Sequence, residues 1–142
     1  MIAIIRIRGT IGIRKDIKET LAYLKLNKPN HCVIVPENEI YLGMIKKVKD
    51  YIAYGKINDK TLKAMIETRG KYSFSKPVEK KDVEKVLKLV KEGKIKESKI
   101  KNLFMLQPPK KGFKRSTKKG FNQKGILGDN KEKINDLLSR ML

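Results

Sequence analysis

The sequence predicts an α+β protein in which three strands alternate with two helices, followed by an α-rich extension that contains a basic loop. Within residues 1–57, segments of β-branched residues alternate with segments whose apolar residues recur at helical spacing. From residue 58 onward helical spacing dominates, apart from a polar stretch over 107–125. The 142 residues are 39% apolar, which is enough for one modest core.

The first strand is expected over Ile2–Arg8, which is rich in isoleucine and ends in basic residues. Gly9-Thr10-Ile11-Gly12 then interrupts the pattern. From about Arg14 the apolar spacing becomes helical, and Lys28-Pro29-Asn30 ends this helix. The residues that carry the helical stripe are Ile17, Leu21 and Leu24.

A second strand is expected over His31–Val35, closed by Pro36, and a third over Tyr51–Ile57. Asn38 is a suitable N-cap for the helix between them. The apolar stripe of that helix comprises Tyr41, Met44, Ile45 and Val48. Both connections are long enough to be helical crossovers that cover one face of the sheet. The other face then needs its own cover or a partner.

Residues 58–142 form the predicted extension, separate from a core over residues 1–57. A helix capped at Asn58 or Asp59 ends before Gly70, and a further helix after Pro77 ends at Gly93. The run Leu103–Leu106 resembles a short strand. A last helix is capped near Asp129 or Asn130. The apolar stripes of these three helices are Leu62, Met65 and Ile66, then Val83, Val86, Leu87 and Val90, and finally Ile134, Leu137, Leu138 and Met141.

The charge is strongly positive, with 35 Lys plus Arg against 15 Asp plus Glu and a net charge of +20. Residues 71–124 hold 18 basic and 5 acidic residues, and residues 107–125 hold seven basic residues and no acid. A uniformly basic surface would not concentrate its excess in this way. The distribution therefore predicts binding to a polyanion, mainly through the second half.

The stretch 107–125 contains a small repeat, because Lys110-Lys111-Gly112-Phe113 recurs as Lys118-Lys119-Gly120-Phe121. Paired lysines neutralise phosphates, and phenylalanine can stack on an unpaired base. With little apolar area to bury, the stretch is expected to be a loop without a fixed conformation until a nucleic acid binds. The alternative is a solvated tail whose phenylalanines pack back onto the core. The predicted RNA-binding residues here are Lys110, Lys111, Phe113, Lys114, Arg115, Lys118, Lys119, Phe121 and Lys124.

A second candidate contact is the turn between the first strand and the first helix, where Arg8, Arg14 and Lys15 flank two glycines. Backbone N–H groups at a helix start favour phosphate. Neither the P-loop nor the dinucleotide spacing is present. The alternative is a plain tight turn with solvated arginines.

Catalytic chemistry is not expected. His31 and Cys32 adjoin, but neighbours on a strand point to opposite faces, so both are interpreted as buried structural residues. One histidine and one cysteine exclude a Cys/His zinc site and a disulfide. No apolar run is long enough to span a membrane, and no signal peptide is visible. We therefore expect no metal, no cofactor and no small-molecule substrate in an intracellular protein.

The sequence resembles the universal L-thirty family of large-subunit ribosomal proteins, in the long archaeal form of that family. The same family includes the eukaryotic protein called L-seven. The resemblance is carried by Asn30–Glu37, Tyr41–Val48, Arg8–Gly12, Tyr51–Gly55 and Pro108–Gly112. It implies a three-stranded antiparallel sheet of order 3-1-2, somewhat like a ferredoxin fold, with the helices on one face. It also implies a non-enzymatic cytoplasmic protein that binds ribosomal RNA and lies beside other proteins of the large subunit.

The resulting hypothesis is a structural constituent of the large ribosomal subunit that stabilises folded ribosomal RNA. Two rivals belong to other classes, a basic DNA-binding chromatin protein and an RNA-modifying enzyme. Composition alone permits the first, whereas the second needs a catalytic pair or a cofactor pocket that the sequence does not contain.

Overall fold

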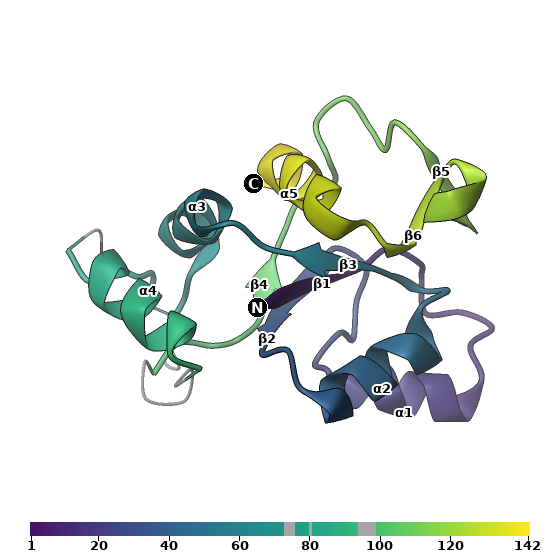
Figure 1. Cartoon of the computed structure of the whole chain (residues 1–142), viewed down its shortest axis with the longest axis horizontal. Coiled ribbons are helices and arrows are strands. Elements are labelled where there is room, and N and C mark those ends of the chain that lie inside the picture. Colours follow the sequence, from purple (N-terminus) through teal and green to yellow (C-terminus); the bar gives the residue numbers. More distant parts are fainter. Residues whose placement is uncertain (73–75, 80, 94–98) are drawn as a thin grey trace.

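A computed structural model describes residues 1–72, 76–79, 81–93 and 99–142, which form one mixed sheet with helices on both faces (Figure 1). The order of strands in the sheet is β4-β2-β1-β3-β6-β5. The strands are β1 (Ile2–Arg6), β2 (His31–Val35), β3 (Ile52–Lys56), β4 (Phe104–Met105), β5 (Ser116–Gly120) and β6 (Gly125–Asp129). The helices are α1 (Lys15–Tyr23), α2 (Glu39–Val48), α3 (Asp59–Arg69), α4 (Val83–Lys91) and α5 (Ile134–Met141).

The first 57 residues adopt the β-α-β-α-β arrangement that the sequence predicts. β1 is the central strand and pairs antiparallel with β2 on one side and β3 on the other. The prediction of only three strands is wrong, because the extension adds three more. β4 pairs antiparallel with β2, whereas β6 pairs in parallel with β3 and β5 pairs in parallel with β6. Both edges of the three-stranded unit offer unpaired backbone groups, and the extension satisfies part of them.

Helices α1 and α2 cover one face of the sheet, as their apolar stripes predict. Side chains alternate along a strand, so Ile2 and Ile4 of β1 point to this face. They pack there with Leu21 of α1 and with Ile45 and Val48 of α2, all of which are buried.

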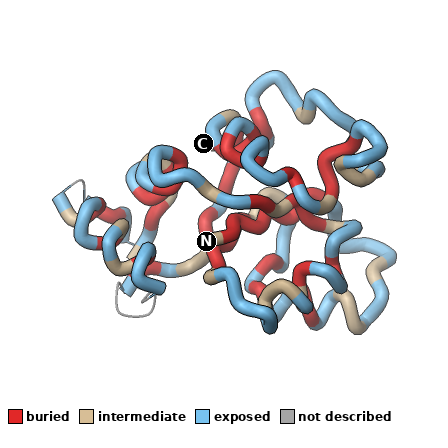
Figure 2. Tube along the Cα trace, in the orientation of Figure 1, coloured by how far each residue is buried: buried red, intermediate tan, exposed pale blue. Residues whose placement is uncertain are grey.

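The opposite face of the sheet is covered by the extension, so the expectation that this face needs a cover is confirmed. Ala3 and Ile5 of β1 point to it and belong to a second buried cluster. α3, α4 and α5 contribute their predicted stripes to this cluster, and the buried segments of both halves meet along the sheet (Figure 2). The stripe residues of α3, α4 and α5 that are buried in this cluster are Leu62, Met65, Ile66, Val83, Val86, Val90, Ile134, Leu137, Leu138 and Met141.

The stretch 107–125 differs from the predicted loop. Residues 107–115 form no helix or strand, but Ser116–Gly120 is β5 and Phe121–Gln123 is a short 3-10 helix, η1. The prediction of an irregular loop is therefore wrong for residues 116–123 and for Gly125, where β6 begins. It considered only apolar burial, whereas β5 gains backbone hydrogen-bonding partners from β6, which is itself anchored on β3.

Gly55 of β3 is needed for the close approach of the chain that follows β6. A β-carbon at this position would overlap the carbonyl oxygen of Lys131 and lie 3.1 Å from the Ile134 side chain. Lys131 belongs to a second 3-10 helix, η2 (Lys131–Lys133), which leads directly into α5. The glycine therefore allows η2 to pack against the sheet.

We expect Gly55→Ala to lower the free energy of unfolding by roughly 1–3 kcal/mol, since η2 or β3 must shift to admit the methyl group. Urea denaturation measures this. Gly43→Ala is the matched control, because a β-carbon at Gly43 in α2 has no neighbour within 4 Å. Helix propensity predicts that this control stabilises the protein by about 0.5–1 kcal/mol. Equal effects of the two substitutions would contradict the packing role of Gly55.

Candidate nucleic-acid interface

The turn between β1 and α1 presents its predicted cations to solvent. Arg8, Arg14 and Lys15 are all exposed. The guanidinium of Arg8 lies 5.5 Å from the centre of the Tyr51 ring and donates a 3.4 Å hydrogen bond to the Asp50 carbonyl. Arg14 forms a 3.3 Å ion pair with Asp16. Exposed pairs of this kind contribute little stability, so a phosphate can compete with Asp16 for Arg14.

Arg6 stabilises the turn between β1 and α1, although the sequence did not identify it as a functional residue. Its side chain is only 2% exposed. The guanidinium donates hydrogen bonds to four backbone carbonyls, those of Leu26 (2.6 Å), Asn27 (3.1 Å), Arg8 (3.0 Å) and Gly9 (2.8 Å). Burial lowers the pKa of Arg6 from its usual value. Arg6 therefore ties the turn after β1 to the connection between α1 and β2.

The alternation of β1 was the signal that could have identified Arg6. Position 6 shares a face with Ile2 and Ile4, and this face is buried under α1 and α2. A buried arginine needs hydrogen-bond acceptors for its guanidinium. The acceptors at Leu26 and Asn27 lie in a connection far from Arg6 in sequence, so the pattern alone does not identify them.

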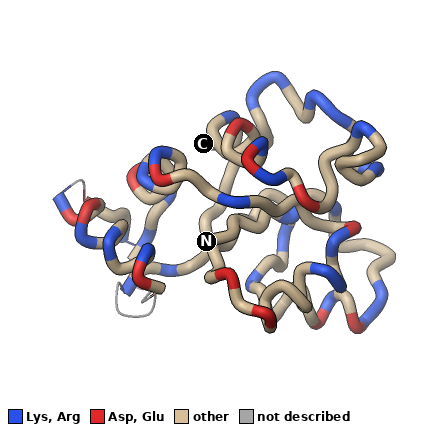
Figure 3. Tube along the Cα trace, in the orientation of Figure 1, with Lys and Arg blue, Asp and Glu red and all other residues tan. Residues whose placement is uncertain are grey.

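The basic loop, here residues 107–125, presents all seven of its cations to solvent. Figure 3 shows these lysines and the arginine along the loop with no acidic residue among them. They are Lys110, Lys111, Lys114, Arg115, Lys118, Lys119 and Lys124.

The start of the basic loop is held against the end of α5. The backbone N–H groups of Gln107 and Lys110 donate to the carbonyls of Met141 (3.0 Å) and Arg140 (2.8 Å). Arg140 in turn donates a 2.9 Å hydrogen bond to the Gly112 carbonyl. These contacts use the backbone of the loop and leave its lysine side chains available to a ligand.

The two phenylalanines of the repeat have different surroundings. Phe113 is half-buried and packs against the core cluster under α5, as the alternative of phenylalanines packing back onto the core predicts. Phe121 is also half-buried, but its ring faces cations: the Arg115 guanidinium lies 4.8 Å and the Lys133 ammonium 5.6 Å from its centre. A cation–π contact with Phe121 therefore positions Arg115 beside the tip of the loop, which is formed by Phe121 and Asn122.

Part of the basic loop lies close to the turn at residues 49–51, which also borders the turn between β1 and α1 (residues 8–15, called the Arg8 turn). A cavity of about 380 Å³ is lined by the tip residues Phe121 and Asn122 together with Lys49 and Asp50 of the turn before β3. A second cavity, of about 390 Å³, is lined by residues 8–12 and by Tyr51 of the same turn. The turn at residues 49–51 thus lies between the two predicted contact regions. Lys110 and Lys111 are instead at the far end of the loop, next to α5.

His31 and Cys32 do not form a reactive pair. Cys32 is completely buried in the cluster under α3 and α5, as predicted, whereas His31 is only half-buried. Burial raises the pKa of the Cys32 thiol from 9.0 to about 12. Burial, together with Lys28 and Arg6, lowers the pKa of His31. The neutral thiol is therefore the stable form of Cys32 in the folded protein.

We expect Cys32 to resist alkylation in the folded protein and to make stability depend on pH at the alkaline end. Because its folded pKa is the higher one, its contribution is fully present below pH 9 and is lost as the pH rises toward 12. Iodoacetamide labelling with and without urea measures the first effect. Cys32→Ala removes the thiol, so the alkaline loss of stability attributed to Cys32 is absent from this variant. Rapid labelling without urea would contradict the buried position.

Two further observations concern the described part of the chain. No group of three or more His, Cys, Asp or Glu side chains in it could hold a metal ion. Among the same residues, no helix combines the length and the apolar character that crossing a membrane requires.

Comparison with known proteins identifies the family. Residues 2–52 match the model of the family described as ribosomal protein L30p/L7e. The chain is 44% identical to the large ribosomal subunit protein uL30 of Methanococcus maripaludis, over 99% of this chain and 98% of that protein. It is 41% identical to uL30 of Methanosphaera stadtmanae over the full length of both, and 42% identical to uL30 of Nanoarchaeum equitans over 99% and 97%. The three-stranded unit, the helical cover and these matches together lead to one conclusion: the chain belongs to the ribosomal protein L30p/L7e family.

Proposed function

We propose that the chain is a structural constituent of the large ribosomal subunit, where it binds and stabilises folded ribosomal RNA. The observation that carries the proposal is the basic loop with seven exposed cations and no carboxylate, whose residues Phe121 and Asn122 share a cavity with the turn at residues 49–51. The names of the archaeal relatives support the assignment to the large subunit.

The RNA-binding surface in this proposal consists of two parts with different roles. Lys110 and Lys111, near α5, would neutralise phosphates at one side of the loop. The tip, with Arg115 and Phe121, and the Arg8 turn would meet a second RNA segment. Converging RNA segments repel one another, and each neutralised phosphate releases a counterion, so contacts on both sides would stabilise their approach. Because A-form RNA hides its major groove, recognition would follow shape and sugar hydroxyls.

Further expectations belong to the same proposal. The chain would lie in the cytoplasm within the ribosome and would contact neighbouring ribosomal proteins there. Residues 1–57 would be the ribosomal core unit and 58–142 its extension, and the three-stranded unit would be related to a ferredoxin fold. The chain belongs to a family of ribosomal proteins, and the predicted absence of enzymatic activity agrees with this family.

Competition binding tests the proposal against a DNA-binding chromatin protein. A labelled, folded fragment of large-subunit ribosomal RNA is bound by the full chain at about 0.15 M salt, and unlabelled RNA or duplex DNA is added at matched phosphate concentration. We expect the unlabelled RNA to compete at least about tenfold better than the DNA, since shape and sugar hydroxyls distinguish the two. Equal competition by RNA and DNA would favour the chromatin alternative.

A further inference from the structure

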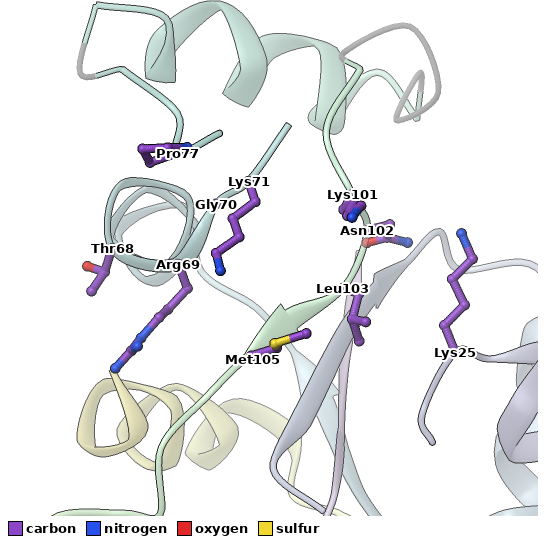
Figure 4. Close-up of a pocket in the computed structure, with 10 residues that line it drawn as sticks. All are labelled: Lys25, Thr68, Arg69, Gly70, Lys71, Pro77, Lys101, Asn102, Leu103 and Met105. Carbon is purple, nitrogen blue, oxygen red and sulfur yellow. The ribbon is translucent and has the colours of Figure 1, made fainter. Parts of the chain in front are cut away.

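A second basic surface, whose lining includes no residue of the basic loop, is a groove of about 570 Å³ beside the outer strand β4 (Figure 4). We call it the β4 groove. Its walls come from three parts of the chain: the end of α3 with the residues after it, the segment 101–105, and Lys25 in the connection after α1. None of the twelve residues predicted to bind RNA lines this groove.

The β4 groove is lined by cations from three separate parts of the chain. Its basic lining residues are Lys25, Arg69, Lys71 and Lys101, and the described residues that line it include no aspartate or glutamate. Figure 4 shows Lys71 extending between α3 and β4, with Lys25 on the opposite side of the segment that carries Asn102 and Leu103. Cations that converge from distant parts of the chain repel one another unless an anion lies between them.

The walls of the groove are fixed by hydrogen bonds. The Lys101 N–H donates a 3.0 Å hydrogen bond to the Lys71 carbonyl and thereby joins two of the walls. The side chain of Asn102 binds both backbone groups of Ile34 in β2: its oxygen accepts from the N–H at 3.1 Å, and its amide donates to the carbonyl. The groove is therefore formed before any ligand binds, which lowers the ordering cost of binding.

Arg69 forms the wall next to α5. Its Nη2 donates a 3.1 Å hydrogen bond to the Leu142 carbonyl, which holds the guanidinium toward the helix. Its Nε is buried and has no hydrogen-bond partner among the described residues. Arg69 therefore contributes positive charge to the groove from a fixed position.

The floor of the groove offers apolar surface beside these cations. Met105 is 57% exposed although it lies in a strand, and Leu103 lies near it. Ribose and base faces are apolar, whereas phosphates are anionic, so a strand of RNA matches both components. An acidic peptide that added a strand to the sheet would need a longer edge than β4, which has only two residues.

We propose that the β4 groove binds a stretch of RNA sugar-phosphate backbone, as a second contact that is independent of the basic loop. The inference rests on the proposed function, because it assigns another surface to the same ligand. Lys25 and Lys71 contact phosphates from opposite sides, and Met105 packs against the sugar or base between them. With contacts here and at the basic loop, the protein binds RNA through two separate sets of residues.

The first test compares Lys25→Ala/Lys71→Ala with the control Lys47→Ala/Lys85→Ala, whose exposed lysines lie on α2 and α4 outside the groove. Both variants lose the same charge. Loss of two phosphate contacts should flatten the slope of log K against log salt by about 1.5 to 2 units and weaken binding of folded large-subunit RNA roughly tenfold or more. The control should stay near the unchanged protein. Equal behaviour of the two variants would overturn the groove proposal while the unchanged protein still bound RNA, whereas failure of the unchanged protein to bind would count against the proposed function itself.

The second test asks which class of molecule occupies the groove in the assembled particle. A benzophenone amino acid replaces Met105, and large subunits that contain the full-length variant are irradiated. Cross-links from position 105 to ribosomal RNA are the expected result. Cross-links to another protein in place of RNA would overturn the proposal and assign the groove to a protein partner.

Discussion

Replacing Lys110, Lys111, Lys118 and Lys119 of the basic loop by alanine will greatly weaken RNA binding and its dependence on salt. If the seven cations of the loop each contact a phosphate, log K should fall with log salt at a slope of about −5 to −6. Removing four of them should flatten this slope by roughly 3 to 4 units. Titration of a folded large-subunit RNA fragment at several salt concentrations measures the change.

The fold gives two reasons to attribute such a loss to binding and not to unfolding. All four side chains are exposed. The contacts that hold the start of the loop to α5 come from backbone groups and from Arg140, which the variant retains. A control with the same loss of charge replaces the exposed helical residues Lys46, Lys47, Lys85 and Lys88 by alanine. If the control flattened the slope as much as the loop variant, the loop would not be the phosphate-binding element.

Arg6→Met is expected to have the largest effect on stability. The substitution keeps an unbranched apolar side chain but removes every donor, so the carbonyls of Leu26, Asn27, Arg8 and Gly9 lose their partner. A buried acceptor without a partner costs about 1–3 kcal/mol, and those nearer the surface can bind water. We expect the free energy of unfolding, measured by urea denaturation, to fall by about 2–4 kcal/mol.

Arg8→Met is the matched control for this substitution. Arg8 lies two residues further along the chain, is exposed, and makes one long hydrogen bond and a ring contact. Its replacement should change stability by no more than about 0.5–1 kcal/mol. It should instead weaken RNA binding, because Arg8 belongs to the predicted contact surface. A result in which Arg6→Met left stability unchanged would contradict the tethering role of Arg6.

Local patterns in the sequence were sufficient for the elements of the first 57 residues and for the helices of the extension. β-branched segments became β1, β2 and β3, and the stripes at Val83–Val90 and Ile134–Met141 became α4 and α5. Helical and strand periodicities are properties of neighbouring residues, so they can be recognised without knowledge of the fold. The same periodicity indicated that one face of the sheet lacked a cover, and the extension supplies it.

Features that depend on contacts between distant segments could not be predicted in this way. The sequence by itself determined the α+β class, the order of helices and strands up to residue 57, the concentration of positive charge and the buried Cys32. Only the tertiary structure decided that Gly125–Asp129 joins β3 in parallel and supports β5, and that four carbonyls surround Arg6. It also decided that Lys25 and Lys71, 46 positions apart, line one groove. The physical reason is that backbone hydrogen-bonding groups and buried charges are satisfied by whichever groups the fold brings near them. A local sequence pattern does not identify those distant groups.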